Sequence, residues 1–186
     1  MKLATFRKCR QVRLGIVKDG EIIDLNAALE HCGPKITRRG KPLPTLDMKG
    51  FLAGGSRLAQ LARKVATGLA GQGGGGTRTY GRGVIFDLTQ VELLPPIANP
   101  PKILCLARNY ISHVEETKGD GPPPSDLLVF MKPSQAVIWP EAPIVILPEC
   151  RELDHEVELA VVVGRGGTIH PAGKGHGACS RIYDSQ

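Results

Sequence analysis

Residues 154–163 read DHEVELAVVV, an acidic run that continues directly into a run of valines. Side chains two residues apart on a β-strand point to the same side of the strand. In a strand that covers this stretch, Asp154, Glu156 and Glu158 therefore share one face. Like charges at this spacing repel one another unless water or a cation offsets them. The stretch thus leaves two interpretations open: a solvent-exposed acidic face, or a cation held between the carboxylates.

Length and composition indicate a globular protein of one ordinary domain or two small ones. The chain has 186 residues, of which 41% are hydrophobic and 23% are charged. No apolar run approaches the roughly 20 residues that span a bilayer, and the N-terminus MKLATFRKCR lacks the apolar region of an export signal. The five cysteines include no CxxC pair. We therefore predict a cytoplasmic protein with no membrane partner.

The positive charge is concentrated in the first part of the chain. Residues 1–100 contain 16 Lys and Arg against 7 Asp and Glu, whereas residues 101–186 contain 8 against 11. The cations are scattered along the sequence, and aromatic residues, which stack on bases, make up only 4% of the chain. From the sequence alone, no nucleic-acid partner is predicted.

Turn and periodicity signals indicate a small N-terminal domain. The runs KLATFR, RLGIV and EIIDL favour β-strands, and Lys18-Asp19-Gly20 predicts a hairpin turn between the last two. Ser56 is a candidate cap for one helix, whose apolar side holds Leu58, Leu61, Val65 and Leu69. Prolines at 95, 96, 100 and 101 mark a boundary. We predict an α+β, mainly β fold: a small α+β domain over 1–98, then a β-rich domain over 99–186.

The second part opens with KILCLARNYISHVEE, where a β-like run leads into a candidate helical turn. His113 and Glu116 are three residues apart and would be neighbours on a helix. A carboxylate beside an imidazole orients the ring and raises its basicity, as a general base requires. An exposed pair without function is the alternative. Further on, VFMKPSQAVI places Lys132 between apolar residues and a proline that restricts its backbone.

Three motifs in order, CLARNYISHVEE, FMKPSQAVI and ILPECRELDHEVELAVVVGRGG, closely resemble the fumarylacetoacetate hydrolase family, specifically its bacterial members with a small N-terminal domain. The resemblance covers about residues 99 to 167. It implies that the second domain is the front part of the family's β-rich catalytic domain. It also implies a small-molecule keto-acid substrate and, in the intact family, a homodimer.

The resemblance assigns roles to individual residues. Glu156 and Glu158 match two carboxylate ligands of a divalent ion, usually Mg²⁺ and sometimes Mn²⁺ or Ca²⁺, with Asp154 in a supporting role. His113 and Glu116 match the pair that activates water or moves protons. Arg108 and Lys132 match positions lining the substrate pocket, where positive charge suits carboxylate and enolate oxygens.

The sequence departs from the family after residue 167. Members carry a further acidic ligand roughly thirty residues beyond the ExE motif, in a segment resembling GYTxxNDxSxRD. This chain instead reads GTIHPAGKGHGACSRIYDSQ, in which Asp184 lies near the required distance among unrelated neighbours. We interpret residues 168–186 as an atypical tail of a C-terminally truncated catalytic domain.

Two functional hypotheses follow. One is a metal-dependent hydrolase or isomerase of the family type, which acts on acylpyruvate-like or 2-oxo/2-hydroxy-dienoic acids by C–C hydrolysis, decarboxylation or tautomerisation. The other is a truncated, catalytically incompetent fragment that at most binds a metal weakly or binds a partner chain. Whether the chain is an enzyme is left open between them.

Overall fold

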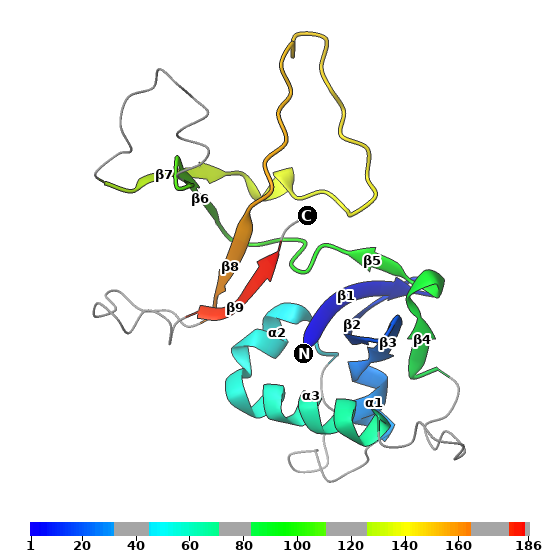
Figure 1. Ribbon diagram of the computed structural model, residues 1–186. Helices are drawn as coiled ribbons and strands as arrows, with labels where there is room; N and C mark the ends of the chain where they lie inside the picture. Colours follow the sequence, from blue (N-terminus) through cyan, green and yellow to red (C-terminus); the bar gives the residue numbers. More distant parts are fainter. Residues whose placement is uncertain (32–44, 71–82, 111–125, 165–178, 185–186) are drawn as a thin grey trace. The chain divides into compact units, whose positions relative to one another are not determined.

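The computed structural model describes residues 1–31, 45–70, 83–110, 126–164 and 179–184 (Figure 1). The chain divides into two units: residues 1–96 with 140–186, and residues 97–139. One boundary between the units therefore falls between Pro96 and Ile97, close to the proline-marked junction. The division of function between 1–98 and 99–186 remains a prediction.

A five-stranded antiparallel sheet forms the N-terminal part, with strand order β4-β3-β2-β1-β5. The first two strands of the chain form its longest ladder, in which Lys2 lies opposite Val17 and Lys8 lies opposite Gln11. The strands are β1 (Lys2–Lys8), β2 (Gln11–Lys18), β3 (Glu21–Asp24), β4 (Ile85–Asp87) and β5 (Glu92–Leu94), and a 3₁₀ turn, η3 (Leu88–Gln90), joins the last two.

Tight turns connect the first three strands. Asp19 and Gly20 have φ of 50° and 80°, the left-handed pair that matches the twist of a two-residue hairpin. The predicted hairpin at Lys18-Asp19-Gly20 is thus confirmed. Cys9 and Arg10 turn β1 into β2 with φ of 47° and 66°. That turn has no glycine or asparagine to announce it in the sequence.

Three helices are described where one was predicted: α1 (Leu25–His31), α2 (Met48–Ala53) and α3 (Gly55–Ala70). Asp47 caps α2 by accepting a hydrogen bond from the Gly50 amide at 2.7 Å. The predicted cap at Ser56 is wrong, because Gly55, with φ of 58°, turns the chain directly from α2 into α3. The helix itself is confirmed, with Val65 buried and Leu58 and Leu61 half-buried.

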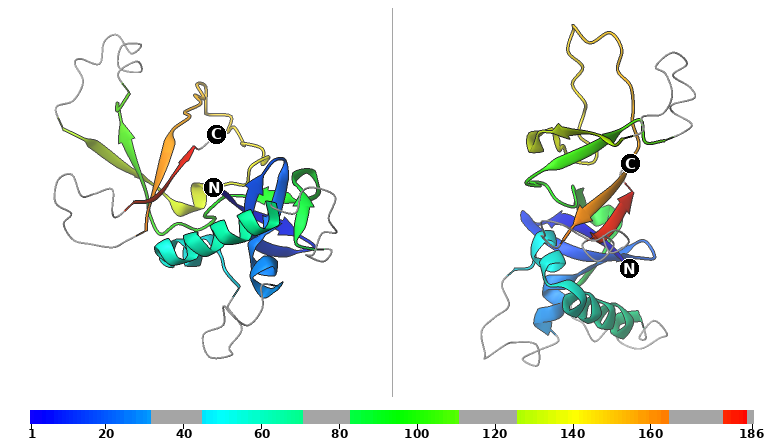
Figure 2. Two further views of the ribbon diagram at one scale, coloured as in Figure 1. Left: turned by 60° about the horizontal axis from the view of Figure 1, so that its bottom comes forward. Right: turned by 90° about the vertical axis from the view of Figure 1, so that its left-hand side faces the viewer.

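The hydrophobic core lies in this N-terminal part. Helix α1 packs against β2 and β3, and α3 packs against α1 and α2 (Figure 2). The largest fully buried apolar side chains are Phe6, Leu14, Ile16, Ile22, Leu25, Phe51 and Val84. Strand β1 buries only Phe6, whereas the middle of β2 buries three consecutive residues, Leu14 to Ile16.

The remaining strands form two separate antiparallel ladders. Strand β6 (Ile103–Ala107) pairs with β7 (Leu128–Lys132), which the turn η4 (Ser134–Ala136) follows. Strand β8 (Leu159–Val163) pairs with β9 (Cys179–Asp184). Between Pro96 and Gly164, no described residue is buried. The predicted mainly β composition is confirmed, but this part of the chain has no core among its described residues.

Within the described ranges, no helix is both long and apolar enough to cross a membrane.

Candidate functional site

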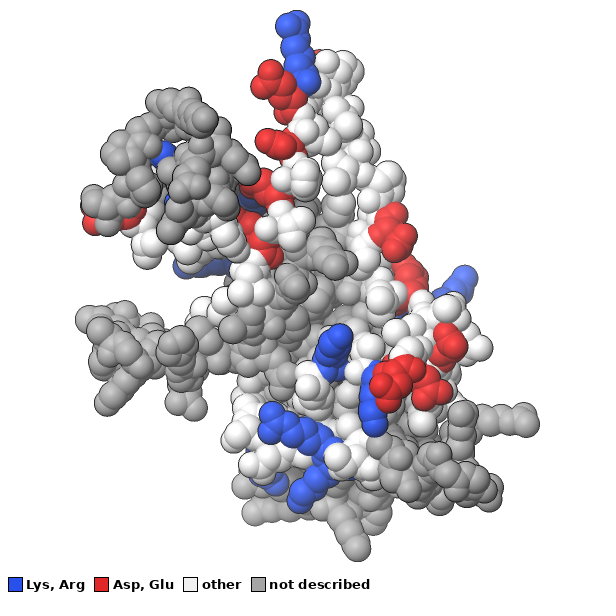
Figure 3. All heavy atoms as spheres, in the orientation of Figure 1, with Lys and Arg blue, Asp and Glu red and all other residues white. Residues whose placement is uncertain are grey.

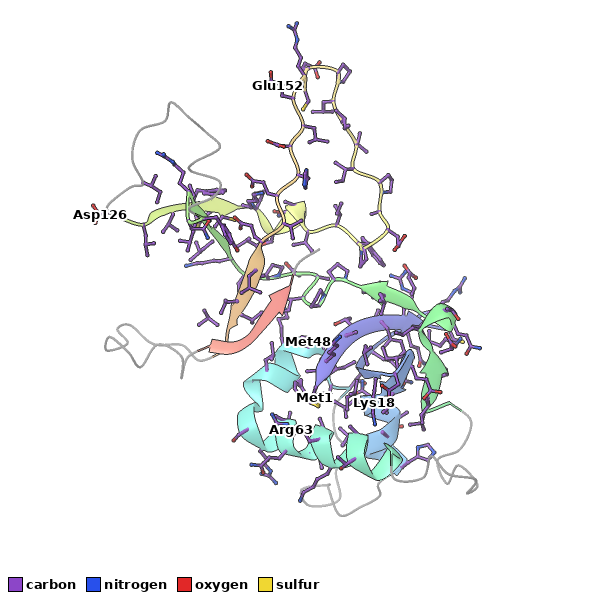
Figure 4. The ribbon with its side chains drawn as sticks, in the orientation of Figure 1. Met1, Lys18, Met48, Arg63, Asp126 and Glu152 are labelled. Carbon is purple, nitrogen blue, oxygen red and sulfur yellow. The ribbon has the colours of Figure 1, made fainter. Side chains whose placement is uncertain are left out.

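The acidic segment does not lie within a strand. Residues 151–158 have no regular secondary structure, and β8 begins only at Leu159. In Figure 1 this segment is the last part of a long loop that leads into β8. Figure 4 labels Glu152 near the outer end of that loop. A strand needs a neighbour for its backbone hydrogen bonds, and β9 pairs only with residues 159–163. The expectation of one strand across 154–163 is therefore corrected.

Solvent reaches the three acidic side chains. Asp154 and Glu156 are exposed, and Glu158 is half-buried and engaged with a neighbouring group. The valines that follow do not form a core, because Val161 is 47% and Val163 is 68% exposed. Water alone can therefore offset the charges of Asp154 and Glu156. Of the two interpretations of this stretch, the exposed acidic face accounts for these two charges without a cation.

Arg108 lies immediately after β6, in an unusual backbone conformation. Its φ is 55°, in the left-handed region that long side chains seldom adopt and that often marks functional sites. Its side chain is half-buried, whereas the following Asn109 and Tyr110 are exposed. The end of β6 thus turns Arg108 away from the pleated course of the strand.

Lys132 lies at the end of β7, directly before Pro133, and is exposed. Its backbone pairs with Ile103. The Ser134 hydroxyl donates a 2.5 Å hydrogen bond to the Pro100 carbonyl, which ties the two chain segments together beside Lys132. Sequence analysis did not identify Ser134, although a Ser after Lys-Pro is a recognisable turn signal.

The two predicted pocket cations lie at opposite ends of the β6–β7 ladder. Lys132 is opposite Ile103, whereas Arg108 follows Ala107, which is opposite Leu128. Arg108 is five positions further along the chain than Ile103, which corresponds to roughly 17 Å at about 3.4 Å per residue. These residues are therefore not brought together within their ladder.

The predicted catalytic pair, His113 and Glu116, lies outside the described residues, which end at 110 and resume at 126. In the described part of the chain, no group of three or more His, Cys, Asp or Glu residues could hold a metal ion. The assignment of Glu156 and Glu158 as metal ligands therefore remains a prediction, since the described residues hold no such group around them.

Asp184 closes the β8–β9 ladder. Its backbone pairs with Leu159, the residue after Glu158. Because Glu158 precedes the strand, this backbone pairing does not test whether Asp184 is a metal ligand.

Comparison with known proteins adds to this geometry. Residues 102–176 match the sequence model described as fumarylacetoacetate (FAA) hydrolase C-terminal. The chain is 39% identical to a mitochondrial oxaloacetate tautomerase of Xenopus laevis over 83 residues. These residues make up 45% of this chain and 25% of that protein. A human mitochondrial oxaloacetate tautomerase is 35% identical to this chain over 83 residues, which make up 45% of this chain and 26% of the human protein.

A Mycobacterium tuberculosis protein is 38% identical over 97 residues, which are 52% of this chain and 35% of that protein. The chain thus spans about a quarter to a third of the length of these curated relatives.

Proposed function

We propose that this chain, whose residues 102–176 match the fumarylacetoacetate hydrolase family model, is a metal-dependent hydrolase or isomerase of that family that acts on acylpyruvate-like or related 2-oxo acids. The observation that carries the proposal is the position of the family match. Residues 102–176 enclose all the residues with predicted roles, namely Arg108, His113, Glu116, Lys132, Glu156 and Glu158.

Tautomerisation is the reaction that the relatives favour. Two of them are named oxaloacetate tautomerases, and keto–enol interconversion moves a proton next to the carbonyl of a 2-oxo acid. C–C hydrolysis and decarboxylation share an enolate intermediate with this reaction, so the same site could serve all three. We propose His113, oriented by Glu116, as the group that moves the proton.

A divalent ion, Mg²⁺ first and Mn²⁺ or Ca²⁺ as alternatives, is part of the proposal. Its donors would be Glu156 and Glu158, whose oxygens fit a hard cation. When bound, such an ion stabilises negative charge that develops on substrate oxygens. Because the described donors are two, we expect weak affinity in the chain alone.

Arg108 is the better candidate for the substrate carboxylate. Its planar guanidinium can bind a carboxylate through two hydrogen bonds, and its side chain is half-buried. Lys132 is exposed and about five residues away along the ladder. We propose that Lys132 contributes longer-range positive charge for an anionic substrate.

Assembly and location belong to the same proposal. A homodimer and a cytoplasmic location are proposed, whereas the names of the frog and human relatives place those proteins in mitochondria.

A fragment that binds without turnover is the second candidate. It is favoured by one observation: no described residue between Pro96 and Gly164 is buried. A segment without a core lacks the rigid support that catalytic geometry requires, so activity would depend on a partner chain.

One assay separates the two candidates. Enolisation of oxaloacetate and cleavage of acetylpyruvate are followed by ultraviolet absorbance with Mg²⁺, with Mn²⁺ and with a chelator. The double variant Glu156→Gln/Glu158→Gln is compared with Glu149→Gln/Glu152→Gln, which removes the same charge from exposed positions nearby. Metal-dependent activity lost only in the first variant supports the enzyme. Background rates in the folded wild type support the fragment, and equal losses in both variants contradict the assignment of the ligands.

A further inference from the structure

The β6–β7 ladder ends beside Lys132, where proline interrupts both strands. Its last pair is Ile103 with Lys132. The next two pairs in this register would each contain a proline, Pro133 on one strand and Pro101 on the other. Proline has no backbone N–H and cannot donate a hydrogen bond to a ladder. Beyond Lys132 the backbone therefore holds the two strands together only weakly.

A side chain joins the two segments where the backbone ladder stops. The Ser134 hydroxyl donates a 2.5 Å hydrogen bond to the Pro100 carbonyl, across 34 positions of the chain. Both residues are half-buried. The turn η4 begins at Ser134, and the Val137 amide bonds back to the Ser134 carbonyl at 3.2 Å. Ser134 therefore fixes the turn that follows Lys132 to the segment that leads into β6.

The position of the Lys132 ammonium depends on the backbone that carries it. Within the described ranges, the ammonium forms no ion pair, and its side chain is exposed. Among the described residues of 97–139, the one acidic residue is Asp126, which lies beyond the opposite end of β7. Figure 3 shows a row of red acidic side chains along the loop that leads into β8, in the other unit. The conformation of Lys132 is therefore set by its place before Pro133, whose φ is −66°, and by the bond that Ser134 forms.

We propose that Ser134 is a positioning residue for Lys132: its hydrogen bond to the Pro100 carbonyl holds the end of β7 and so sets where the lysine charge lies. The inference rests on the proposed function, in which Lys132 contributes positive charge for an anionic substrate. A cation held in place loses less conformational freedom on binding an anion than a mobile one does. In this role Ser134 does not touch the substrate, and its effect on affinity passes through Lys132.

The test follows binding of pyruvate, which carries the carboxylate and 2-oxo group of the proposed substrates, by ligand-observed NMR with Mg²⁺ in excess. Ser134→Ala removes the hydroxyl and Ser134→Thr keeps it. Both are compared with Lys132→Met, with the double variant Ser134→Ala/Lys132→Met, and with Ser56→Ala, a serine exposed at the start of α3. The kcat and KM for oxaloacetate are measured in the same proteins. Hydrogen–deuterium exchange over residues 128–137 reports on the end of β7 independently of any ligand.

The expected result is a loss that depends on Lys132. Ser134→Ala should speed exchange over β7 and η4 and weaken pyruvate binding by up to about five-fold, the equivalent of one ordinary hydrogen bond. It should raise KM with kcat unchanged, the pattern of lost ground-state binding. Ser134→Thr should restore both values, and Ser56→Ala should change neither. In the Lys132→Met protein, Ser134→Ala should have no further effect on binding, because the two residues act through one charge.

Two kinds of failure are distinguishable. Pyruvate binding that is equal in wild type and Ser134→Ala, an equal loss with and without Lys132, or unchanged exchange in Ser134→Ala would overturn the positioning role while leaving the proposed function in place. A folded wild type that neither binds pyruvate nor turns over oxaloacetate would overturn the proposed function, and the role of Ser134 with it.

Discussion

The guanidinium of Arg13 lies 3.1 Å from the carboxylate of Asp24, which is 2% exposed and immediately precedes α1. The other carboxylate oxygen of Asp24 accepts a hydrogen bond from the Ala27 amide at 2.9 Å. The Asp24 amide in turn donates to the Val84 carbonyl at 2.7 Å. One buried acid therefore joins β2, α1 and the segment that leads into β4.

Loss of the Arg13 charge should destabilise the N-terminal part. Arg13→Met leaves the buried Asp24 carboxylate without its cation. We expect the free energy of unfolding to fall by about 2–3 kcal/mol. This loss is smaller than that for a fully buried ion pair, because Arg13 is partly exposed. Urea unfolding followed by helical circular dichroism measures it. Arg10→Met, at an exposed turn, is the control, and equal stabilities of the two variants would contradict the role of the pair.

Asp24 should also make stability depend on pH. Burial, which outweighs the Ala27 hydrogen bond and the Arg13 charge, raises the pKa of Asp24 above its ordinary value of 3.8. A raised pKa in the folded state means that the contribution of Asp24 is fully present below 3.8 and is lost as the pH rises through the folded pKa. Relative to Asp24→Asn, the wild type should therefore become less stable over that window and level off above it. Urea unfolding of both proteins at a series of pH values measures the difference, and a trend of opposite sign would show that Arg13 outweighs burial.

Two glycines should respond oppositely to alanine. A Cβ on Gly15 would meet the Ile22 side chain and come within 3.0 Å of Phe6 Cε1, whereas a Cβ on Gly68, in α3, meets nothing within 4 Å. We expect Gly15→Ala to cost about 1–3 kcal/mol by overpacking, and Gly68→Ala to gain about 0.5–1 kcal/mol by helix propensity. Thermal unfolding of both variants measures the two effects, and a stabilised Gly15→Ala would contradict the close packing of β2 on β3.

The features that the sequence predicted well are those with local chemistry. Asp19-Gly20 announces a two-residue turn because both positions need φ above zero, and the periodic apolar residues of α3 announce a helix. Helices α1 and α2 were missed because each has only six or seven residues, too few for a period to show. Their signals were the caps Asp24 and Asp47, and Asp24 looked like the end of a strand.

The acidic segment shows where such prediction stops. The strand expected across DHEVELAVVV is present only over LAVVV, because the sequence cannot tell where the partner strand ends. Only the pairing of β9 with residues 159–163 leaves Glu156 and Glu158 outside the ladder. The separation of Arg108 and Lys132 likewise depends on the register of β6 against β7, which the two motifs do not contain.

Divalent metal binding should depend on the two glutamates. Titration calorimetry with Mg²⁺ and Mn²⁺ should show weak binding in the wild type. Affinity should fall in Glu156→Gln and in Glu158→Gln, and fall further in the double variant, because ligand charge sets affinity in oxygen-ligand sites. Asp184→Asn should have no effect, because the residues around Asp184 do not match those around the family's further acidic ligand. Binding unchanged in the double variant would contradict the ligand assignment, and weakened binding in Asp184→Asn would show that the tail contributes.

Catalysis should depend on His113 more than on any other histidine. If His113 moves the substrate proton, His113→Ala should lower kcat by about 10² to 10⁴-fold, the usual contribution of general acid–base catalysis, and Glu116→Gln should lower it less, because the imidazole remains and only its orientation and basicity change. His31→Ala is the matched control: His31 lies at the end of α1, where its ring nitrogen Nδ1 is 2.9 Å from the Ala27 carbonyl. If the wild-type rate is too low to compare with the rates of the variants, the same substitutions are made in an extended chain. The extension is the part of the Mycobacterium tuberculosis relative that follows its matching segment. Turnover that survives the loss of His113 in either protein would assign the proton transfer to another group, and a folded, metal-loaded extended chain without turnover would count against these substrates.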